Sequence, residues 1–171
     1  VSRADRSSQW LECYGAYDWV FLDNIKLTEI VNVILERGKP RPENARPLQQ
    51  WRKQGKKVLA ASFTSWLTTK YQPLTAEDVY REWSTSEWPN YGFEADGYYG
   101  TLMSEFGNYV PTAEEFPAFT GAVKRLSQEA KFKNKVFYPF TYSSMVETER
   151  TKAFLKTVLE AGYRWAEERY L

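Results

Sequence analysis

Histidine is absent from the 171-residue sequence, and cysteine occurs once, at Cys13. Without histidine there can be no Ser-His-Asp or Cys-His triad, no imidazole metal ligand and no imidazole pH switch. A single cysteine forms neither an intrachain disulfide nor a cysteine-rich metal site. We therefore expect no metal site and no cofactor, and any catalysis would have to use carboxylates, lysine, tyrosine or a borrowed cofactor.

Long apolar runs are missing too. No stretch approaches the roughly 18 apolar residues of a membrane-spanning helix, so we expect a soluble chain with no transmembrane segment. The first residues, Val1 to Arg6, are polar and lack the apolar run of a signal peptide. The lone cysteine is compatible with a reducing compartment and the missing initiator methionine with a processed N-terminus. The sequence leaves the compartment itself unknown.

The composition is otherwise that of an ordinary globular protein, with 43% hydrophobic and 26% charged residues. A chain of 171 residues can bury one substantial hydrophobic core. We expect a polar N-terminal arm over residues 1–14 and a single globular domain over residues 15–171.

Hydrophobic periodicity predicts a mixture of helices and strands. Apolar residues at helical spacing, with capping residues and glycine stops, predict helices in five places: residues 27–37, residues 47–54, a helix opening at Thr75, residues 112–130 and residues 147–170. β-Branched and aromatic runs predict short strands beginning near residues 17, 57, 91 and 135. The expected fold class is α/β or α+β and helix-rich, with about five helices and three to four short strands around one core.

Two segments leave alternatives open. Residues 57–63 follow Gly55 and are typical of a buried strand, but the apolar residues from Leu59 to Tyr71 also fit one helical face. In that case the protein would be mostly α with a small sheet. The strand over 135–142 contains Pro139, which cannot donate to a neighbouring strand, so we expect an edge strand or a bulge there.

Charge is unevenly distributed although the net charge is only +1. From Arg37 to Lys57 there are eight basic residues and one acid, whereas from Glu77 to Glu115 there are nine acids and one base. The two segments are either solvated faces that happen to differ, or a dipolar surface that orients a protein partner or drives self-association. The small net charge gives no global nucleic-acid footprint, so we do not expect a nucleic-acid partner.

Aromatic residues make up 17% of the chain and are concentrated after residue 82. They belong either to a large core or to a surface that binds partners or sugar rings, since Trp and Tyr serve both purposes. The second interpretation gives a candidate binding set, which adds the neighbouring basic residues to the aromatic ones: Trp83, Trp88, Tyr91, Phe93, Tyr98, Tyr99, Arg52, Lys53, Lys56 and Lys57.

Three carboxylates lie within the aromatic, glycine-rich segment, at Glu94, Asp96 and Glu105. Two carboxylates in an aromatic pocket are the minimum requirement for glycoside hydrolysis, because one acts as an acid and the other as nucleophile or base. These residues are the catalytic candidates of a histidine-independent, carboxylate-based glycosidase. The alternative is that they form turns or are simply solvated.

The passage from Gln50 through Gly55 to Ala61 resembles the helix–glycine–strand passage of (β/α)-barrel, chitinase-like glycosidases. Residues 91–93, followed by Asp96 and Gly97, resemble the catalytic strand of that family. The family pattern continues with alternating acids and ends in glutamate, whereas this chain continues from Tyr98 to Met103 without an acid. The catalytic positions therefore do not carry over, and the resemblance implies at most a partial or inactive relative.

Two functional hypotheses follow. The first is a non-catalytic binding or assembly component that docks a protein partner, or a second copy of itself, through an aromatic-rich surface and oppositely charged faces. The second is a carbohydrate-active domain, either a glycoside hydrolase or a glycan-binding module, that uses carboxylates beside tryptophans.

Overall fold

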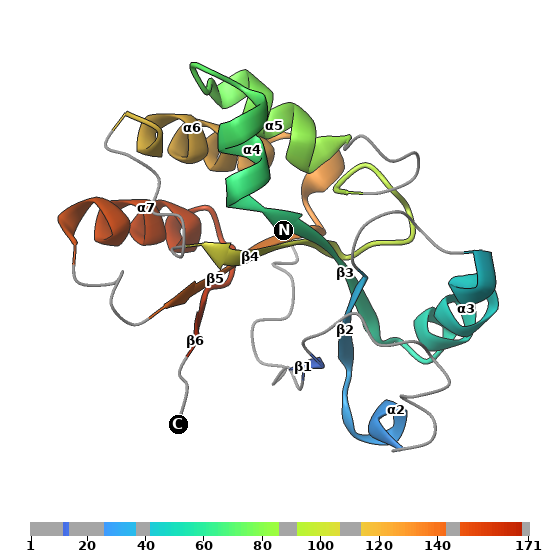
Figure 1. Cartoon of the computed structure of the whole chain (residues 1–171). Helices are drawn as coiled ribbons and strands as arrows, with labels where there is room; N and C mark the ends of the chain where they lie inside the picture. Colours follow the sequence, from blue (N-terminus) through green and yellow to red (C-terminus); the bar gives the residue numbers. More distant parts are fainter. Residues whose placement is uncertain are drawn as a thin grey trace.

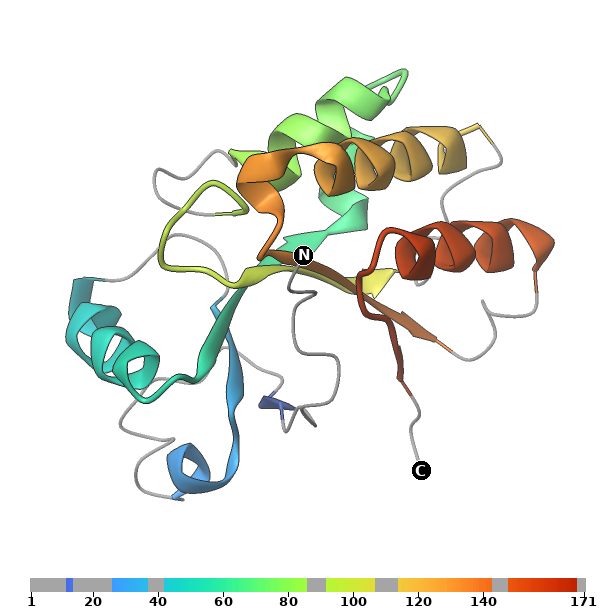
Figure 2. The same ribbon diagram turned by 180° about the vertical axis from the view of Figure 1, so that it is seen from behind.

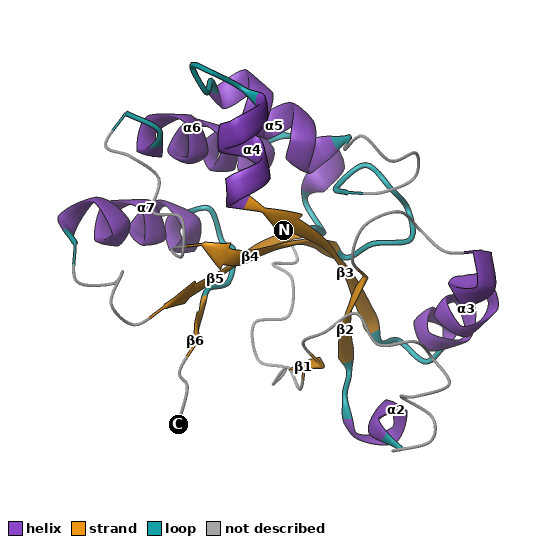
Figure 3. Ribbon diagram, viewed as in Figure 1, coloured by secondary structure: helices purple, strands orange, loops and turns teal. Residues whose placement is uncertain are grey.

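The computed structural model describes residues 12–13, 26–36, 42–85, 92–106, 114–142 and 148–168. Six parallel strands form one sheet in sequential order: β1 (Glu12–Cys13), β2 (Val33–Glu36), β3 (Lys57–Phe63), β4 (Gly100–Phe106), β5 (Val136–Tyr142) and β6 (Ala166–Glu168). The chain therefore has an α/β fold, as expected, built on four longer strands and two short edge strands (Figures 1 and 3). The predicted strand near residue 17 lies outside the described residues.

Helices connect the strands. They are α2 (Leu27–Ile30), α3 (Ala45–Lys53), α4 (Thr64–Lys70), α5 (Ala76–Ser84), α6 (Phe116–Gln128) and α7 (Glu149–Glu160), with single 3-10 turns at Pro42–Asn44 and Ala130–Phe132. Figures 1 and 2 show α4, α5, α6 and α7 on the same face of the sheet. The strand order is that found in (β/α) barrels, but the helices are not all on one face, because α3 packs against the side of the sheet opposite to α5, α6 and α7.

The predicted helix over 27–37 is wrong beyond its first turn, because Val33–Glu36 forms β2. All four residues of β2 are buried. A strand covered on both faces is a continuous apolar run, which periodicity cannot distinguish from a buried helix. Residues 57–63, by contrast, form β3 and are followed directly by α4, so the all-helical alternative for 57–71 is also wrong.

The α3 side of the sheet has its own small core. Ile34, Val58 and Ala60 pack with Leu48 and Trp51 of α3, and the Trp51 indole donates to the Lys57 carbonyl oxygen at 2.9 Å. Side chains alternate along a strand, so the neighbours of these strand residues face the other way. These neighbours, among them Leu59 and Ala61, belong to the main core.

Aromatic rings fill the main core between the sheet and α5–α7. Trp83 is fully buried, with its ring centroid 4.3 Å from that of Phe137 and 5.9 Å from that of Phe119. Phe93 packs edge-on against Phe132 at 5.3 Å. A large part of the aromatic content therefore stabilises the core.

Thr75 forms the predicted cap of α5: its side chain accepts from the Asp78 amide, and Asp78 in turn accepts from the Thr75 amide. The predicted strand over 91–95 is wrong, because residues 93 and 94 form a turn whose amides donate to the carbonyl oxygens of Trp83 and Ser84 at the end of α5. The strand lies further on, as β4, so the second part of the glycosidase resemblance has no structural counterpart. The first part corresponds to α3, Gly55 and β3.

The ends of the last two helices differ from expectation. α6 begins at Phe116, with Glu115 at the cap position, and Thr112 lies outside the described residues. α7 ends at Glu160 instead of continuing to Tyr170, because Gly162 adopts a left-handed conformation with φ 84° and β6 follows. Trp165 is thus not part of a helix; its indole donates to the Thr141 hydroxyl at 2.7 Å.

β5 lies between β4 and β6, so the edge position expected from Pro139 is wrong. The alternative expectation, an irregularity, is confirmed: the register between β4 and β5 shifts after the pair Met103–Pro139. A missing amide is tolerated there because the ladder is already interrupted.

The backbone of β5 lies close to Gly100 of β4, and this contact yields a stability prediction. A Cβ atom at Gly100 would lie 1.8 Å from the Val136 carbonyl oxygen, a distance that requires the backbone of β4 or β5 to move. We expect Gly100→Ala to lower the free energy of unfolding by at least about 3 kcal/mol in urea titrations. Gly55→Ala is the control: it meets no atom within 4 Å, but φ is +74°, so it should cost only about 1 kcal/mol. Equal losses for the two variants would contradict the steric argument.

Candidate functional site

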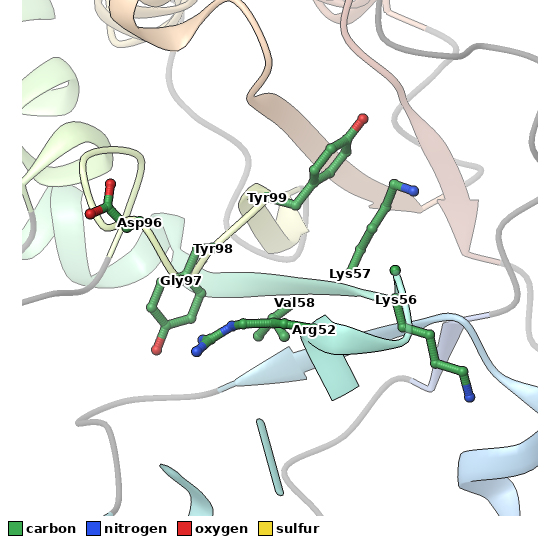
Figure 4. A pocket seen from close by; sticks show the side chains of 9 residues that line it. Arg52, Lys56, Lys57, Val58, Asp96, Gly97, Tyr98 and Tyr99 are labelled. Carbon is green, nitrogen blue, oxygen red and sulfur yellow. The ribbon is translucent and has the colours of Figure 1, made fainter. Parts of the chain in front are cut away.

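A cavity of about 290 Å³ lies at the edge of the sheet where β3 and β4 begin (Figure 4). We call it the amino-edge pocket. It collects residues from the end of α3, the turn into β3 and the loop before β4: Arg52, Gly55, Lys56, Lys57, Val58, Asp96, Gly97, Tyr98 and Tyr99.

The turn at Gly55 places the basic residues at this edge. Gly55 has φ +74° and its amide donates to the Arg52 carbonyl oxygen at 2.9 Å, which ends α3. The chain then reverses into β3, so Lys56 and Lys57 follow within two residues of the turn. Only glycine adopts this conformation at little cost.

Each basic side chain of the pocket lies over an aromatic ring. The Arg52 guanidinium carbon is 5.7 Å from the centre of the Tyr98 ring. The Lys57 ammonium is 4.9 Å from that of Tyr99, and the Lys56 ammonium is 4.4 Å from that of Trp51. Such cation–π contacts hold the charges in place without neutralising them.

Gly97 makes room for the Arg52 guanidinium. A Cβ atom at Gly97 would lie 2.5 Å from Nη2 and 2.7 Å from Cζ of Arg52. The guanidinium is therefore confined between the Gly97 backbone and the Tyr98 ring. Although Arg52 is exposed, these two contacts restrict its guanidinium, which lowers the entropy that it loses when it binds an anion.

Lys135, just before β5, forms hydrogen bonds with the loop before β4. Its ammonium donates to the carbonyl oxygens of Ala95 and Tyr98 at 2.7 and 2.6 Å. Burial lowers the pKa of Lys135 below its usual 10.5, partly opposed by the nearby Asp96 carboxylate. At the other side of this loop, the Tyr98 hydroxyl donates to the buried Glu36 carboxylate at the end of β2.

The two charged segments of the sequence behave differently. Acids of the segment 77–115 are ion-paired within the protein: Glu77 with Arg125, Asp78 with Arg81, Glu82 with Lys70 and Glu94 with Lys131. By contrast, no carboxylate of the described residues forms an ion pair with Arg52, Lys53 or Lys57. The positive charges of Arg52, Lys53 and Lys57 are therefore left available among the described residues.

The structure divides the predicted binding residues into three groups. Arg52, Lys56, Lys57, Tyr98 and Tyr99 are brought together in the amino-edge pocket, and Lys53 is exposed on the last turn of α3. Trp83 and Phe93 are fully buried in the core, where no partner can reach them in this conformation. Trp88 and Tyr91 lie outside the described residues.

The three candidate catalytic carboxylates are not brought together. Glu94 pairs with Lys131 at 2.5 Å, and Asp96 lines the amino-edge pocket. Glu105 lies near the opposite end of β4. Glu105 lies five positions after Gly100 along β4, a rise of roughly 16 Å, whereas the two carboxyl groups of a glycosidase lie within roughly 10 Å of each other. Asp96 and Glu105 therefore cannot act as one catalytic pair.

Sequence reasoning did not foresee the parts of Gly97 and Lys135 in this site. A glycine in a glycine-rich loop and a lysine before a strand are common, and neither residue type signals a long-range contact. Their roles depend on the parallel pairing of β3, β4 and β5, which brings residues 52, 97 and 135 to the same edge.

No protein-family model, no curated protein and no solved structure matches this chain. None of the helices in the described ranges is long and apolar enough to cross a membrane. Within the same ranges, no three acidic or cysteine side chains are grouped so that they could hold a metal ion. The fold and the amino-edge pocket thus define an α/β protein with a pocket lined by cationic and aromatic side chains.

The Lys135 contacts yield a second prediction. Lys135→Met keeps the apolar stem but leaves two carbonyl oxygens without their donor, so the free energy of unfolding should fall by about 1–2 kcal/mol in urea titrations. Lys133→Met, an exposed control, should change it by less than about 0.5 kcal/mol. Because the folded-state pKa of Lys135 is below the unfolded value of 10.5, the unfolded state binds more protons and the stability from this group increases with pH. The difference in free energy of unfolding between the wild type and Lys135→Met should therefore grow as the pH approaches 10.5. A difference that shrinks over this pH range would contradict this account.

Proposed function

We propose that this chain is a non-catalytic binding component that docks an acidic segment of a protein partner in the amino-edge pocket. The observation that carries the proposal is the Arg52 guanidinium beside Gly97 and the Tyr98 ring in the pocket, with Lys56 and Lys57 on the same pocket lining (Figure 4). Arginine and tyrosine are among the residues that dominate binding energy at protein interfaces.

The geometry favours a carboxylate as the bound group. Arg52 is held in place by Gly97 and Tyr98, and a planar guanidinium can bind a carboxylate through two parallel hydrogen bonds. Lys57, from the start of β3, adds a second positive charge. Asp96 on the loop opposite would accept an N–H of the bound segment.

The position of the pocket favours binding over catalysis. In α/β barrels and open parallel sheets, active sites lie at the carboxyl ends of the strands. The amino-edge pocket is at the opposite end, where β3 and β4 begin. The acidic segment of the chain supports the proposal less, because four of its acids are ion-paired within the protein. The basic residues alone would attract the partner.

Labelled peptides test this function directly. A glutamate-rich peptide with one aromatic residue should bind, and its lysine-rich counterpart should not, as measured by fluorescence anisotropy. Arg52→Gln should weaken the acidic peptide at least about tenfold, since a hydrogen bond to a charged group contributes about 1.5–3 kcal/mol. Gly97→Ala should also weaken it, because the new methyl group displaces the Arg52 guanidinium without removing its charge.

Lys152→Gln is the matched control, because Lys152 lies on α7 and pairs with Glu149. It should bind the peptide as the wild type does. Equal binding of the acidic and basic peptides, or binding that is unchanged in Arg52→Gln, would exclude the amino-edge pocket as the docking site.

A carbohydrate-active function is the second candidate, and one observation favours it. Glu105 lies next to the last residue of β4 in a sheet with the strand order of (β/α) barrels, at the end where such proteins carry catalytic residues. This function predicts that a glycan quenches tryptophan fluorescence, and that Glu105→Gln abolishes hydrolysis while the urea midpoint stays unchanged. A panel of soluble glycans that causes neither quenching nor hydrolysis would exclude it.

A further inference from the structure

A second cavity, of about 640 Å³, lies between α6 and α7, away from the amino-edge pocket. We call it the α6–α7 groove. Phe116 and Phe154 are nearly buried at its base, with ring centroids 6.2 Å apart. Small or short side chains and two cations complete the lining: Pro117, Thr120, Gly121, Lys124, Arg150, Ala153 and Thr157.

The charges of the groove are unbalanced. Lys124 and Arg150 line it, and no acid does. The other cations of the two helices, Arg125, Lys152 and Lys156, each have a carboxylate partner. In the described part of the chain, neither Lys124 nor Arg150 forms an ion pair. The groove therefore combines an apolar base with a positive potential that its own residues leave unsatisfied.

We infer that the α6–α7 groove binds a free, single-chain amphipathic carboxylate. The apolar chain would lie along the accessible lining formed by Pro117, Ala153 and Thr157, above the buried rings of Phe116 and Phe154. The carboxylate would contact Arg150 or Lys124. A cationic ligand would meet repulsion from both residues, and a neutral one would leave their charges unused.

The dimensions favour a small molecule over a partner helix. The lining spans residues 116–124 of α6 and residues 150–157 of α7, which is roughly 12 Å of helix. A volume of about 640 Å³ falls within the range of small-molecule sites. A docked helix of ordinary length, about 11–12 residues, would extend beyond the groove at its ends.

Calorimetry with decanoate, below the concentration at which it forms micelles, tests the inference. We expect decanoate to bind with one-to-one stoichiometry, decyl maltoside, which has the same alkyl chain and no charge, to bind about tenfold more weakly, and decyltrimethylammonium to bind more weakly still. Lys124→Gln and Arg150→Gln should each lower the affinity for decanoate about threefold, because an exposed ion pair contributes about 0.2–1 kcal/mol. The double variant should lower it about tenfold. Ala153→Phe, which places a ring in the groove, should abolish binding.

Two control variants separate this site from other effects. Lys152→Gln, one position from Ala153 and already ion-paired, should bind decanoate as the wild type does. Arg52→Gln should do the same, so the result is independent of the amino-edge pocket. The inference is overturned if the cationic and anionic alkyl chains bind equally, if the double variant binds unchanged, or if the protein binds only phosphatidylglycerol vesicles and not monomeric decanoate.

Discussion

The parallel pairing of β3 with β4 is the constraint on which the rest of this structure depends. Because both strands run in the same direction, their first residues lie at one edge of the sheet, with Leu59 opposite Gly100. The end of α3 and the loop before β4 must therefore meet there. Lys135, just before β5, is brought to the same edge by the pairing of β4 with β5 and holds the loop through two carbonyl oxygens.

Ion pairing within the protein decides which surface charges remain available to a ligand. The acids of α5 and of the following loop are ion-paired with cations of α4, α5, α6 and the 3-10 turn at Ala130–Phe132, so their charge stabilises the protein locally. Arg52 and Lys57 lie over aromatic rings instead and form no ion pair within the described residues, so their charge is available to a ligand. The same contrast recurs on α6 and α7, where the two cations of the groove are the ones without an ion pair among the described residues.

Local signals in the sequence predicted several elements well. The Thr75 cap, the glycine stop at Gly55 and the strand over 57–63 depend on contacts close along the chain, and the structure contains all three. The failures have a different origin. β2 and β4 are covered on both faces, so neither shows the alternation typical of a half-exposed strand, and α7 ends where one glycine overrides a continuing apolar stripe.

In the candidate site, too, some features follow from the sequence alone and others from tertiary contacts. The sequence alone determined that no histidine or cysteine chemistry is available, that basic residues gather before β3, and that aromatic residues are abundant. Tertiary structure decided which of these residues meet: Trp83 and Phe93 are buried in the core, whereas Tyr98 and Tyr99 join Arg52 and Lys57 in a pocket. The physical reason is that the sequence itself gives the residue types that are present. Which of them are buried and which converge depends on strand pairing between residues far apart in the chain.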